Sequence, residues 1–528
     1  MTTPSGRSPK GTACINCRQK KIRCDGRRPV CSPCSSSLPS ACRYSDGNAS
    51  PDQRLREEIA ILESRLEYLE NPTTPSRGVS LSAATSPIAN PGGRLHTPLH
   101  ISLNMRQALF RSFFPYSIDF GFFLDGSRFS AAVTSASPQQ QPFPSILSSC
   151  QLLGAYLSPV NELSALQTAF LSQAMYDVSS GLAREQTHLG RSLLHCIQAE
   201  VLLSQYFFIN GRILEGQYRL SNAVSMTLGA GFHKIRSTAM HTFGTSGMSS
   251  LLPPVDPVEE GERINALWQV VIMNCCWSAA TASVSNIAYE PSQSRIDAPW
   301  PLDSGSYSQT HYPDNFRGSS TIQNFLAGVP DNAVSLIAMH AKASILFERA
   351  SLLRRQYHPN MSLTEATRFQ QSFDSVNRLI NAMATLLPSL TSSGHSRNNL
   401  RRWLIVHTLF RATSIVLHGI FAQQDQSSRG QVLAAAESIV GLLRSVNLSD
   451  FPFIDPIMGH LWMITANVFI EEMKSQSSRM PQRKSLREVI DLVEALMSTM
   501  NIFAPRSSYI ETQLDNVRRS YNHISRAR

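Results

Sequence analysis

The sequence contains none of the short motifs that mark the common catalytic sites. We find no Walker loop, no G-x-G-x-x-G turn after a strand, no H-E-x-x-H and no G-x-S-x-G. His195 and His233 adjoin predicted helices and have no acidic partner at a useful spacing, which is typical of ordinary core or surface histidines. These absences argue against an enzyme.

Long apolar segments are also scarce. Residues 1–11 are polar and lack the apolar core of a secretory signal, so we expect the cysteines to lie in a reducing compartment. Residues 266–284 come nearest to a membrane span, but Gln269, Asn274 and several hydroxyl residues interrupt them, which favours a buried helix and no membrane contact. Four cysteines are expected to be buried packing residues: Cys150, Cys196, Cys275 and Cys276.

Charged residues are few and unevenly distributed. The 528 residues are 42% hydrophobic and 16% charged, which argues against wholesale disorder and allows two to four domains, or one large helical domain with appendages. Residues 1–50 hold nine Lys or Arg and two Asp, a net charge of +7 out of +10 for the chain. An anionic partner is therefore expected to bind this segment.

Six of the ten cysteines lie in the same basic segment. They form a C-x2-C-x6-C unit that occurs twice, with the second copy one residue longer. Each copy offers three thiolates, whereas a closed zinc site needs four ligands, so two zinc ions require two shared sulfurs. Symmetry makes Cys14 and Cys31 the bridging pair. The predicted ligands of two Zn²⁺ are Cys14, Cys17, Cys24, Cys31, Cys34 and Cys42.

Two other uses of these cysteines have to be weighed. Three disulfides would suit a small secreted domain, but this chain has no secretory signal and continues for hundreds of residues. A metallothionein-like tract would lack the basic helix between the ligands. The doubled spacing favours the two-zinc cluster.

Residues 14–42 resemble the fungal zinc binuclear cluster (Zn2Cys6) family of transcription factors. The resemblance is carried by the run from Cys14 to Cys31, which includes Pro29 in the loop that joins the two halves. It implies that the helix after Cys17 enters the major groove of double-stranded DNA and reads a CGG triplet. It also implies base contacts by Lys20 and Lys21 and phosphate contacts by Arg18 and Arg23, roles that suit the chemistry of guanine edges and phosphates.

Residues 51–70 are predicted to form a short dimerisation helix. Ser50 is the expected N-cap, and the helix ends at Asn71-Pro72. Its apolar residues are spaced as in a coiled coil of about two heptads, which predicts a homodimer on two DNA half-sites. The alternative is an amphipathic helix that packs on its own chain. The predicted dimer seam is Leu55, Ile59, Leu62, Leu66 and Leu69.

The remaining segments complete the predicted organisation. Residues 1–13 are expected to be a disordered tail, 14–45 the zinc domain and 71–100 a linker rich in Pro, Ser and Thr, either unmodified or phosphorylated at its Ser/Thr-Pro sites. From residue 101 to 528 the pattern is helical, so the fold class is all-α. The expected helices cover 190–208, 212–228, 262–286, 332–357, 363–387, 397–424, 429–446, 454–474 and 484–502, with loops at 235–260 and 288–320.

The helical region resembles the regulatory middle homology domain of the same family. The resemblance lies in Gly211–Gly216, Leu228–His233 and the helix that contains Trp268, while Phe120–Leu124 is similar to a segment of basidiomycete members. It implies a domain that inhibits, dimerises or senses an effector. The C-terminal end has no acidic run that would mark an activation segment.

Together these features predict a nuclear regulator of RNA polymerase II transcription. The family resemblance implies promoter sites that contain CGG, a metabolic or secondary-metabolite gene set, and contacts with the transcription machinery or co-regulators. The alternative is a zinc-stabilised scaffold that recruits partners through its helical domain. A scaffold gives no reason for the adjacent Lys20 and Lys21 between zinc ligands.

Overall fold

The computed structural model divides into two compact units, Met1–Leu95 and His96–Arg528. It describes residues 13–14, 17, 21–25, 31–35 and 42 of the first unit, and residues 101–135, 137, 139–181, 189–238, 253–287, 295–303, 306–309, 312–390, 396–475 and 484–526 of the second. The predicted coiled coil, linker and, apart from Ala13, N-terminal tail lie outside these residues.

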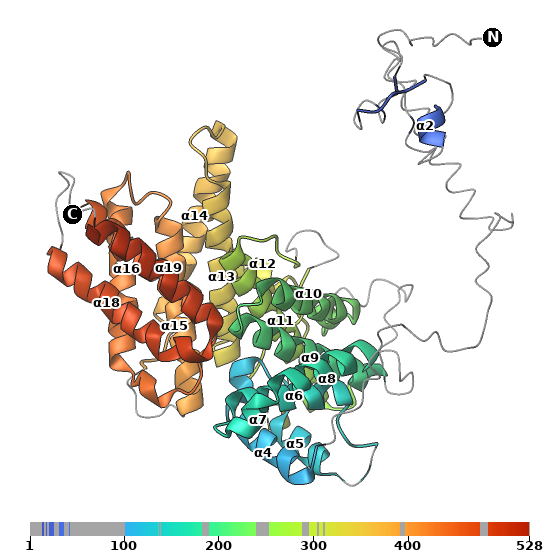
Figure 1. The fold of residues 1–528 in the computed structure, drawn as a ribbon. Helices are drawn as coiled ribbons and strands as arrows, with labels where there is room; N and C mark the ends of the chain where they lie inside the picture. The colour runs from blue at the N-terminus through green and yellow to red at the C-terminus, as the bar shows by residue number, and fades with distance from the viewer. Residues whose placement is uncertain are drawn as a thin grey trace, which may run out of the picture. The chain divides into compact units, whose positions relative to one another are not determined.

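The second unit is built from helices, as predicted (Figure 1). Its one strand-like pairing within the described ranges is an isolated bridge between Ser237 and Gly318. The first half comprises α4 (Leu103–Phe113), η2 (Phe114–Phe120), α5 (Gly126–Thr134), α6 (Pro144–Leu157), α7 (Asn161–Ala165), α8 (Gln167–Gly181), α9 (Leu189–Ile209), α10 (Ile213–Gly229), η3 (Phe232–Lys234) and α11 (Pro257–Thr281). The second half comprises η5 (Ser306–Ser308), α12 (Thr321–Leu326), α13 (Leu336–Gln356), α14 (Leu363–Ala384), α15 (Arg397–His418), α16 (Gln426–Ser445), η6 (Leu448–Asp450), α17 (Ile457–Ser475), α18 (Leu486–Phe503), η7 (Ala504–Arg506) and α19 (Ser508–Arg526).

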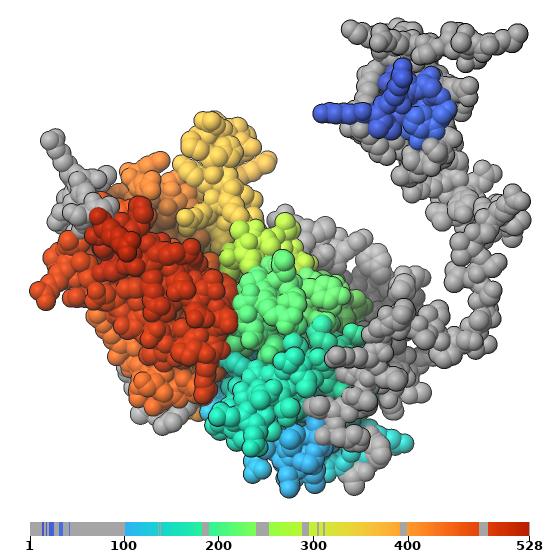
Figure 2. Space-filling view, viewed as in Figure 1, coloured from blue at the N-terminus to red at the C-terminus, as the bar shows by residue number. Residues whose placement is uncertain are grey.

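Helices that are close in sequence pack against one another along the second unit. α9 pairs with α10, α11 with α13, and α15 with α16, and the C-terminal α19 returns to contact α17 and α9. Aromatic stacking joins these layers, with ring centroids 3.7 Å apart for Phe208 and Trp277 and 4.4 Å apart for Trp268 and Trp300. In the space-filling view the C-terminal helices adjoin the α9–α11 region without an intervening gap (Figure 2).

Local sequence signals explain where several helices begin. Ser362 and Ser485 each form a capping box with the Glu three residues later, at the starts of α14 and α18. Asp256 accepts hydrogen bonds from the first-turn N–H groups of α11, and Pro257 occupies the first helical position. The predicted loop at 235–260 is therefore wrong at its end, because the helix begins at residue 257 rather than 262.

The turn between α9 and α10 confirms the predicted break at Asn210-Gly211. Gly211 has φ of 69°, a left-handed conformation that glycine adopts without steric cost. Gly216 lies against the ring of Phe208, where an added Cβ would be 2.5 Å from Cε1. Gly211 thus serves the turn, and Gly216 serves the close packing of this helix pair.

The two most apolar helices belong to the core of the second unit. Gly190–Ile209 in α9 is long and apolar enough to cross a membrane, but 94% of this segment is buried within the fold. α11, which covers most of residues 266–284, is buried along nearly its whole length, from Val258 to Ser278. The buried-helix prediction for residues 266–284 is confirmed, but the prediction that they come nearest to a membrane span is wrong, because among the described residues Gly190–Ile209 does.

Candidate metal centre and nucleic-acid interface

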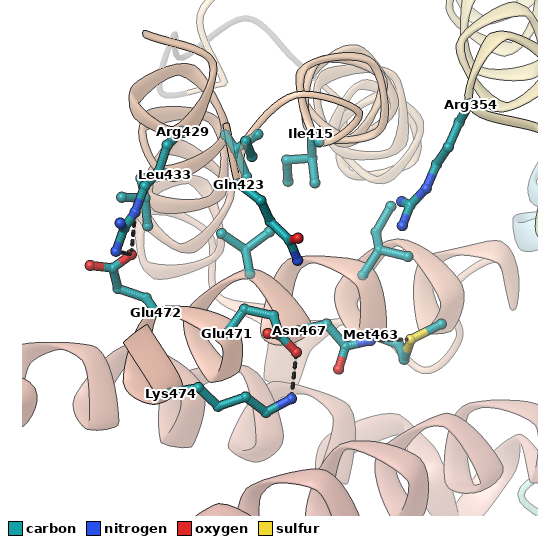
Figure 3. A pocket seen from close by; sticks show the side chains of 15 residues that line it. Arg354, Ile415, Gln423, Arg429, Leu433, Met463, Asn467, Glu471, Glu472 and Lys474 are labelled. Atoms are coloured by element: carbon teal, nitrogen blue, oxygen red, sulfur yellow. Dashed lines mark hydrogen bonds and ion pairs between the residues drawn. The ribbon is translucent and has the colours of Figure 1, made fainter. Parts of the chain in front are cut away.

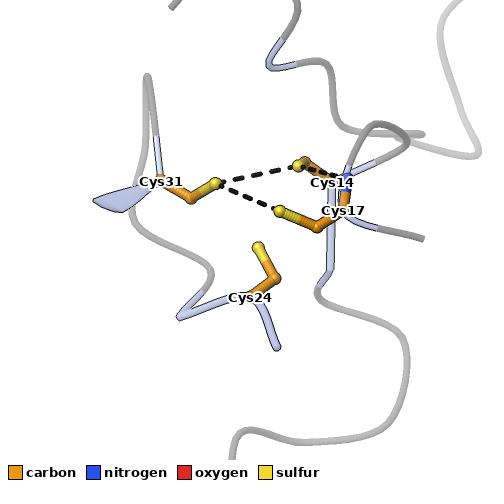
Figure 4. A group of neighbouring side chains, drawn as sticks. All are labelled: Cys14, Cys17, Cys24 and Cys31. Carbon is orange, nitrogen blue, oxygen red and sulfur yellow. Dashed lines mark hydrogen bonds between the residues drawn. The ribbon is translucent and has the colours of Figure 1, made fainter. Parts of the chain in front are cut away.

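The six N-terminal cysteines converge on one point of the first unit. Five of the side chains are buried and that of Cys42 is half-buried, and among the described residues of this unit Ala13 packs against them. Figure 4 shows the sulfurs of Cys14, Cys17, Cys24 and Cys31 turned toward one another. Metal–thiolate bonds would stabilise such a group of buried thiols.

The sulfur positions form two groups of four. One group is Cys14, Cys17, Cys24 and Cys31, the other is Cys14, Cys31, Cys34 and Cys42, and within each all sulfurs lie within 4.8 Å of one another. Both groups contain Cys14 and Cys31.

The distances between sulfurs suit tetrahedral zinc. With Zn–S bonds of about 2.3 Å, sulfurs at the corners of a tetrahedron are about 3.8 Å apart. The Sγ–Sγ distances are 3.8 Å for Cys14–Cys31, 3.7 Å for Cys17–Cys31, 3.7 Å for Cys14–Cys34 and 3.7 Å for Cys31–Cys42. The residues therefore fit two zinc ions whose coordination spheres share the Cys14–Cys31 edge.

Backbone groups hold the sulfurs in place. The N–H of Cys17 donates to Sγ of Cys14 at 3.4 Å, and the N–H of Cys31 donates to Sγ of Cys42 at 3.3 Å. These donors would stabilise the negative charge of metal-bound thiolates.

Asp25 connects the two halves of the cysteine segment. Its carboxylate accepts from the backbone N–H of Ser32 at 3.1 Å and from the Ser32 hydroxyl at 2.5 Å. Ser32 is the first residue of the short helix α2 (Ser32–Ser35), which carries Cys34. Asp25 thus supplies a cap to this helix from the other cysteine repeat. The spacing of the cysteines did not reveal this role, although an acidic residue directly after Cys24 was a visible signal.

The thiols differ in how readily they ionise. Burial opposes ionisation of Cys14, but hydrogen bonds from the Cys17 N–H and from neighbouring thiols outweigh it and lower the pKa of Cys14 to about 6. Burial raises the pKa of Cys17 to about 12 and also raises the pKa of Cys31. Because zinc binds thiolates, the metal must displace the protons that remain, so zinc affinity depends on pH.

Lys21 follows Cys17 by four residues, and Cys17 has a helical backbone. The N–H of Ile22 donates to the carbonyl of Cys17 at 3.1 Å, and Lys21 has φ of 53°. This combination is the left-handed cap that ends many helices, here with lysine in the place usually taken by glycine. Lys21 and Arg23 are both exposed, whereas Arg18 and Lys20 lie outside the described residues. The structure thus places a lysine and an arginine in solvent close to the sulfur cluster.

The six sulfurs and their shared edge define a small binuclear metal–thiolate domain, and comparison with known proteins gives its family. Residues 12–49 match the model of the fungal Zn(2)-Cys(6) binuclear cluster domain. The N-terminal unit contains a domain of this family, and its six cysteines can coordinate two zinc ions. The predicted resemblance and the predicted zinc cofactor are confirmed.

Curated relatives share this part of the chain. Transcription factor FBD3 of Gibberella moniliformis is 40% identical over 62 residues, which cover 12% of this chain and 8% of that protein. Zinc finger transcription factor YRM1 of Saccharomyces cerevisiae is 33% identical over 90 residues, covering 15% of this chain and 11% of that protein. Thiamine repressible genes regulatory protein thi5 of Schizosaccharomyces pombe is 38% identical over 66 residues, covering 12% of this chain and 8% of that protein. The chain thus spans only about a tenth of the length of the relatives it matches, so the likeness to a middle homology domain and to basidiomycete members stays a prediction.

The predicted packing residues of the second unit are buried as expected. Cys150, Cys196, Cys275 and Cys276 all lie in the hydrophobic interior. His195 accepts a hydrogen bond from the N–H of Phe143 at 3.3 Å, and burial lowers its pKa to about 3, as for a neutral core histidine.

Proposed function

We propose that this protein is a zinc-dependent, sequence-specific DNA-binding regulator of RNA polymerase II transcription that acts in the nucleus. The observation that carries the proposal is the pair of four-sulfur groups sharing Cys14 and Cys31, within a segment that matches the fungal binuclear cluster domain. The relatives that share this segment are named as transcription factors or a gene-regulatory protein. The net charge of +7 in residues 1–50 supports a polyanionic partner.

Lys21 and Lys20 are proposed to read the guanines of a CGG triplet. A lysine ammonium can donate to guanine O6 and N7 in the major groove, and Lys21 is exposed to solvent. Arg18 and Arg23 are proposed to contact phosphates, which adds affinity without sequence preference. The zinc ions perform no chemistry in this proposal. They fix the segment that carries these basic side chains.

The regulator is proposed to act as a homodimer on two CGG half-sites. Residues 51–70 supply the coiled-coil seam of Leu55, Ile59, Leu62, Leu66 and Leu69, and residues 43–54 set the separation of the half-sites. The family resemblance makes a metabolic or secondary-metabolite gene set the proposed target, reached with the help of co-regulators.

The readout is tested by measuring binding of the full chain to a CGG duplex and to a scrambled duplex. Lys21→Ala should lose most of the preference for CGG and still hold two zinc ions per chain, because Lys21 is not a ligand. Arg23→Ala should weaken binding to both duplexes alike and flatten the salt dependence.

Two results would count against this assignment. An unchanged CGG preference in Lys21→Ala would contradict the assigned base contact. Equally weak binding of the unmodified, zinc-loaded chain to both duplexes would favour the alternative function, a zinc-stabilised scaffold.

A further inference from the structure

The second unit contains a pocket at its C-terminal end that the proposed DNA contacts do not use. It has a volume of about 580 Å³ and is lined by α13, α15, α16, α17 and the turn between α15 and α16 (Figure 3). Small-molecule sites typically have volumes of about 300–1,000 Å³. Its apolar wall consists of Ile415, Val432, Leu433, Met463, Ile464 and Val468.

Four of the charged residues in the pocket wall form two ion pairs, and the charges cancel within each pair. Arg429 of α16 contacts Glu472 of α17 at 2.7 Å, with both side chains largely buried, and so ties these two helices together. Lys474 contacts Glu471 at 2.5 Å at the exposed edge of α17. Neither pair leaves a net charge for a ligand to meet.

Arg354 is the remaining charged residue of the pocket. It lies in the last turn of α13 and makes no hydrogen bond or ion pair with any residue that the structure describes. Figure 3 shows its guanidinium reaching from α13 toward the centre of the pocket, above Met463 and Asn467. With three basic and two acidic lining residues, the pocket has a net charge of +1.

Two amides add hydrogen-bonding capacity beside this charge. Gln423 projects into the pocket from the turn after α15, and Asn467 lies opposite on α17 (Figure 3). The Asn467 amide nitrogen donates to the sulfur of Met463 at 3.0 Å, a weak acceptor that a ligand oxygen would replace favourably.

We infer that this pocket binds a small organic monoanion, namely an apolar body that carries one carboxylate. The carboxylate accepts from the guanidinium of Arg354 and from the amides of Gln423 or Asn467, and the body lies on the apolar wall. A cation would meet the uncompensated charge of Arg354. Arg354 is exposed, so its guanidinium stays hydrated beside a neutral apolar molecule. Such a molecule gains no charge-assisted hydrogen bond and binds more weakly than the carboxylate. A sensor of an acidic metabolite would need a site of this kind, distinct from the zinc domain.

The zinc-loaded full chain is titrated with 8-anilinonaphthalene-1-sulfonate, an apolar fluorescent monoanion, and the probe is then displaced by decanoate or by decan-1-ol. Decanoate should displace it at a concentration about tenfold lower than decan-1-ol, the difference expected for one charge-assisted hydrogen bond. Arg354→Ala should weaken decanoate about tenfold and leave decan-1-ol unchanged.

Arg355→Ala is the matched control, because it removes the same charge from the next residue, which does not line the pocket. It should bind both compounds like the parent. Ala422→Trp, at the half-buried rim, should reduce binding of both compounds by filling the pocket, with the thermal transition checked for folding. Equal effects of Arg354→Ala and Arg355→Ala, or no displacement by decanoate below about 1 mM, would overturn the inference.

Discussion

Asp119 and Arg401, which are 282 residues apart in the chain, form an ion pair inside the helical unit, with Nη2 of Arg401 2.5 Å from Oδ2 of Asp119. Their side chains are 5% and 4% exposed. The pair joins the start of this unit, at η2, to α15. Arg401 also lies over the rings of Tyr116 and Phe451, at 5.1 and 5.6 Å from their centroids.

Breaking this pair from one side should be costly. Asp119→Ala removes the carboxylate that accepts two hydrogen bonds from the buried guanidinium of Arg401, so we expect the free energy of unfolding to fall by about 3–5 kcal/mol. Urea unfolding followed by tryptophan fluorescence measures this in the helical unit, because all five tryptophans lie between residues 268 and 462.

Two variants control this measurement. Asp515→Ala removes an exposed partner of Arg518 and should cost about 1 kcal/mol or less. The double variant Asp119→Leu with Arg401→Met removes both charges and should lose less stability than Asp119→Ala alone. A larger loss in the double variant would mean that the pair itself is not the source of the cost.

Glu262 makes the stability of the helical unit depend on pH. Burial raises its pKa from 4.5 to about 7, against a hydrogen bond from the backbone N–H of Asp125 at 2.8 Å. An acid whose pKa is raised on folding stabilises the folded state fully at pH values below its ordinary pKa. For Glu262 this stabilisation is lost as the pH rises through about 7.

Glu262→Gln keeps an acceptor for the Asp125 N–H and removes the charge. It should therefore be more stable than the parent at pH 8, by about 2–3 kcal/mol, and equal to it at pH 4.5. The control is Glu511→Gln at an exposed position, which should have the same free energy of unfolding as the parent at both pH values. If the free energy of unfolding, measured by urea unfolding, depends on pH in the same way for Glu262→Gln and the parent, then Glu262 ionises normally.

Asp25 should contribute to zinc retention although it is not a ligand. Asp25→Ala removes the acceptor for the Ser32 N–H and should cost about 1 kcal/mol, as for other lost helix caps, which corresponds to about fivefold weaker zinc binding. Asp25→Asn retains an acceptor and should lose less. Competition with a chromogenic chelator measures both variants, and equal zinc affinity in Asp25→Ala and the parent would refute the cap.

Removal of zinc should affect the two units differently. A chelator should unfold the cysteine segment, in which the thiols are the buried residues among those that the structure describes, and leave the core of the helical unit intact. Circular dichroism at the helical minimum and tryptophan fluorescence should therefore change little while two zinc ions are released. Loss of the tryptophan signal together with zinc would mean that the helical unit needs the metal.

The parts of this molecule that depend on local patterns could be predicted from the sequence. The spacing of the cysteines was sufficient for the sulfur cluster, because the ligands lie within 29 residues. Apolar periodicity located α9, α10, α13, α14 and α16–α18 to within four residues at each end, whereas α15 ends at His418, six residues before the predicted end at residue 424. α19 has no counterpart among the predicted helices, although its buried residues recur at helical spacing: Tyr509, Ile510, Gln513, Leu514, Val517 and Ile524.

Features that depend on distant contacts could not be predicted in this way. The Asp119–Arg401 pair and the pocket at Arg354 arise from helices brought together by the whole fold. The left-handed backbone at Lys21 could not be predicted either, because lysine has no preference for this conformation. It accompanies the hydrogen bond from the Ile22 N–H to the Cys17 carbonyl.

We propose that two zinc ions, held on the shared Cys14–Cys31 edge, create the DNA-reading surface. The most direct test is to titrate zinc into the metal-free full chain and to measure zinc content and affinity for the CGG duplex together. Preference for CGG over scrambled DNA should appear as two zinc ions bind per chain and should be lost in Lys21→Ala. CGG preference in the metal-free chain, or saturation at one zinc ion, would contradict it.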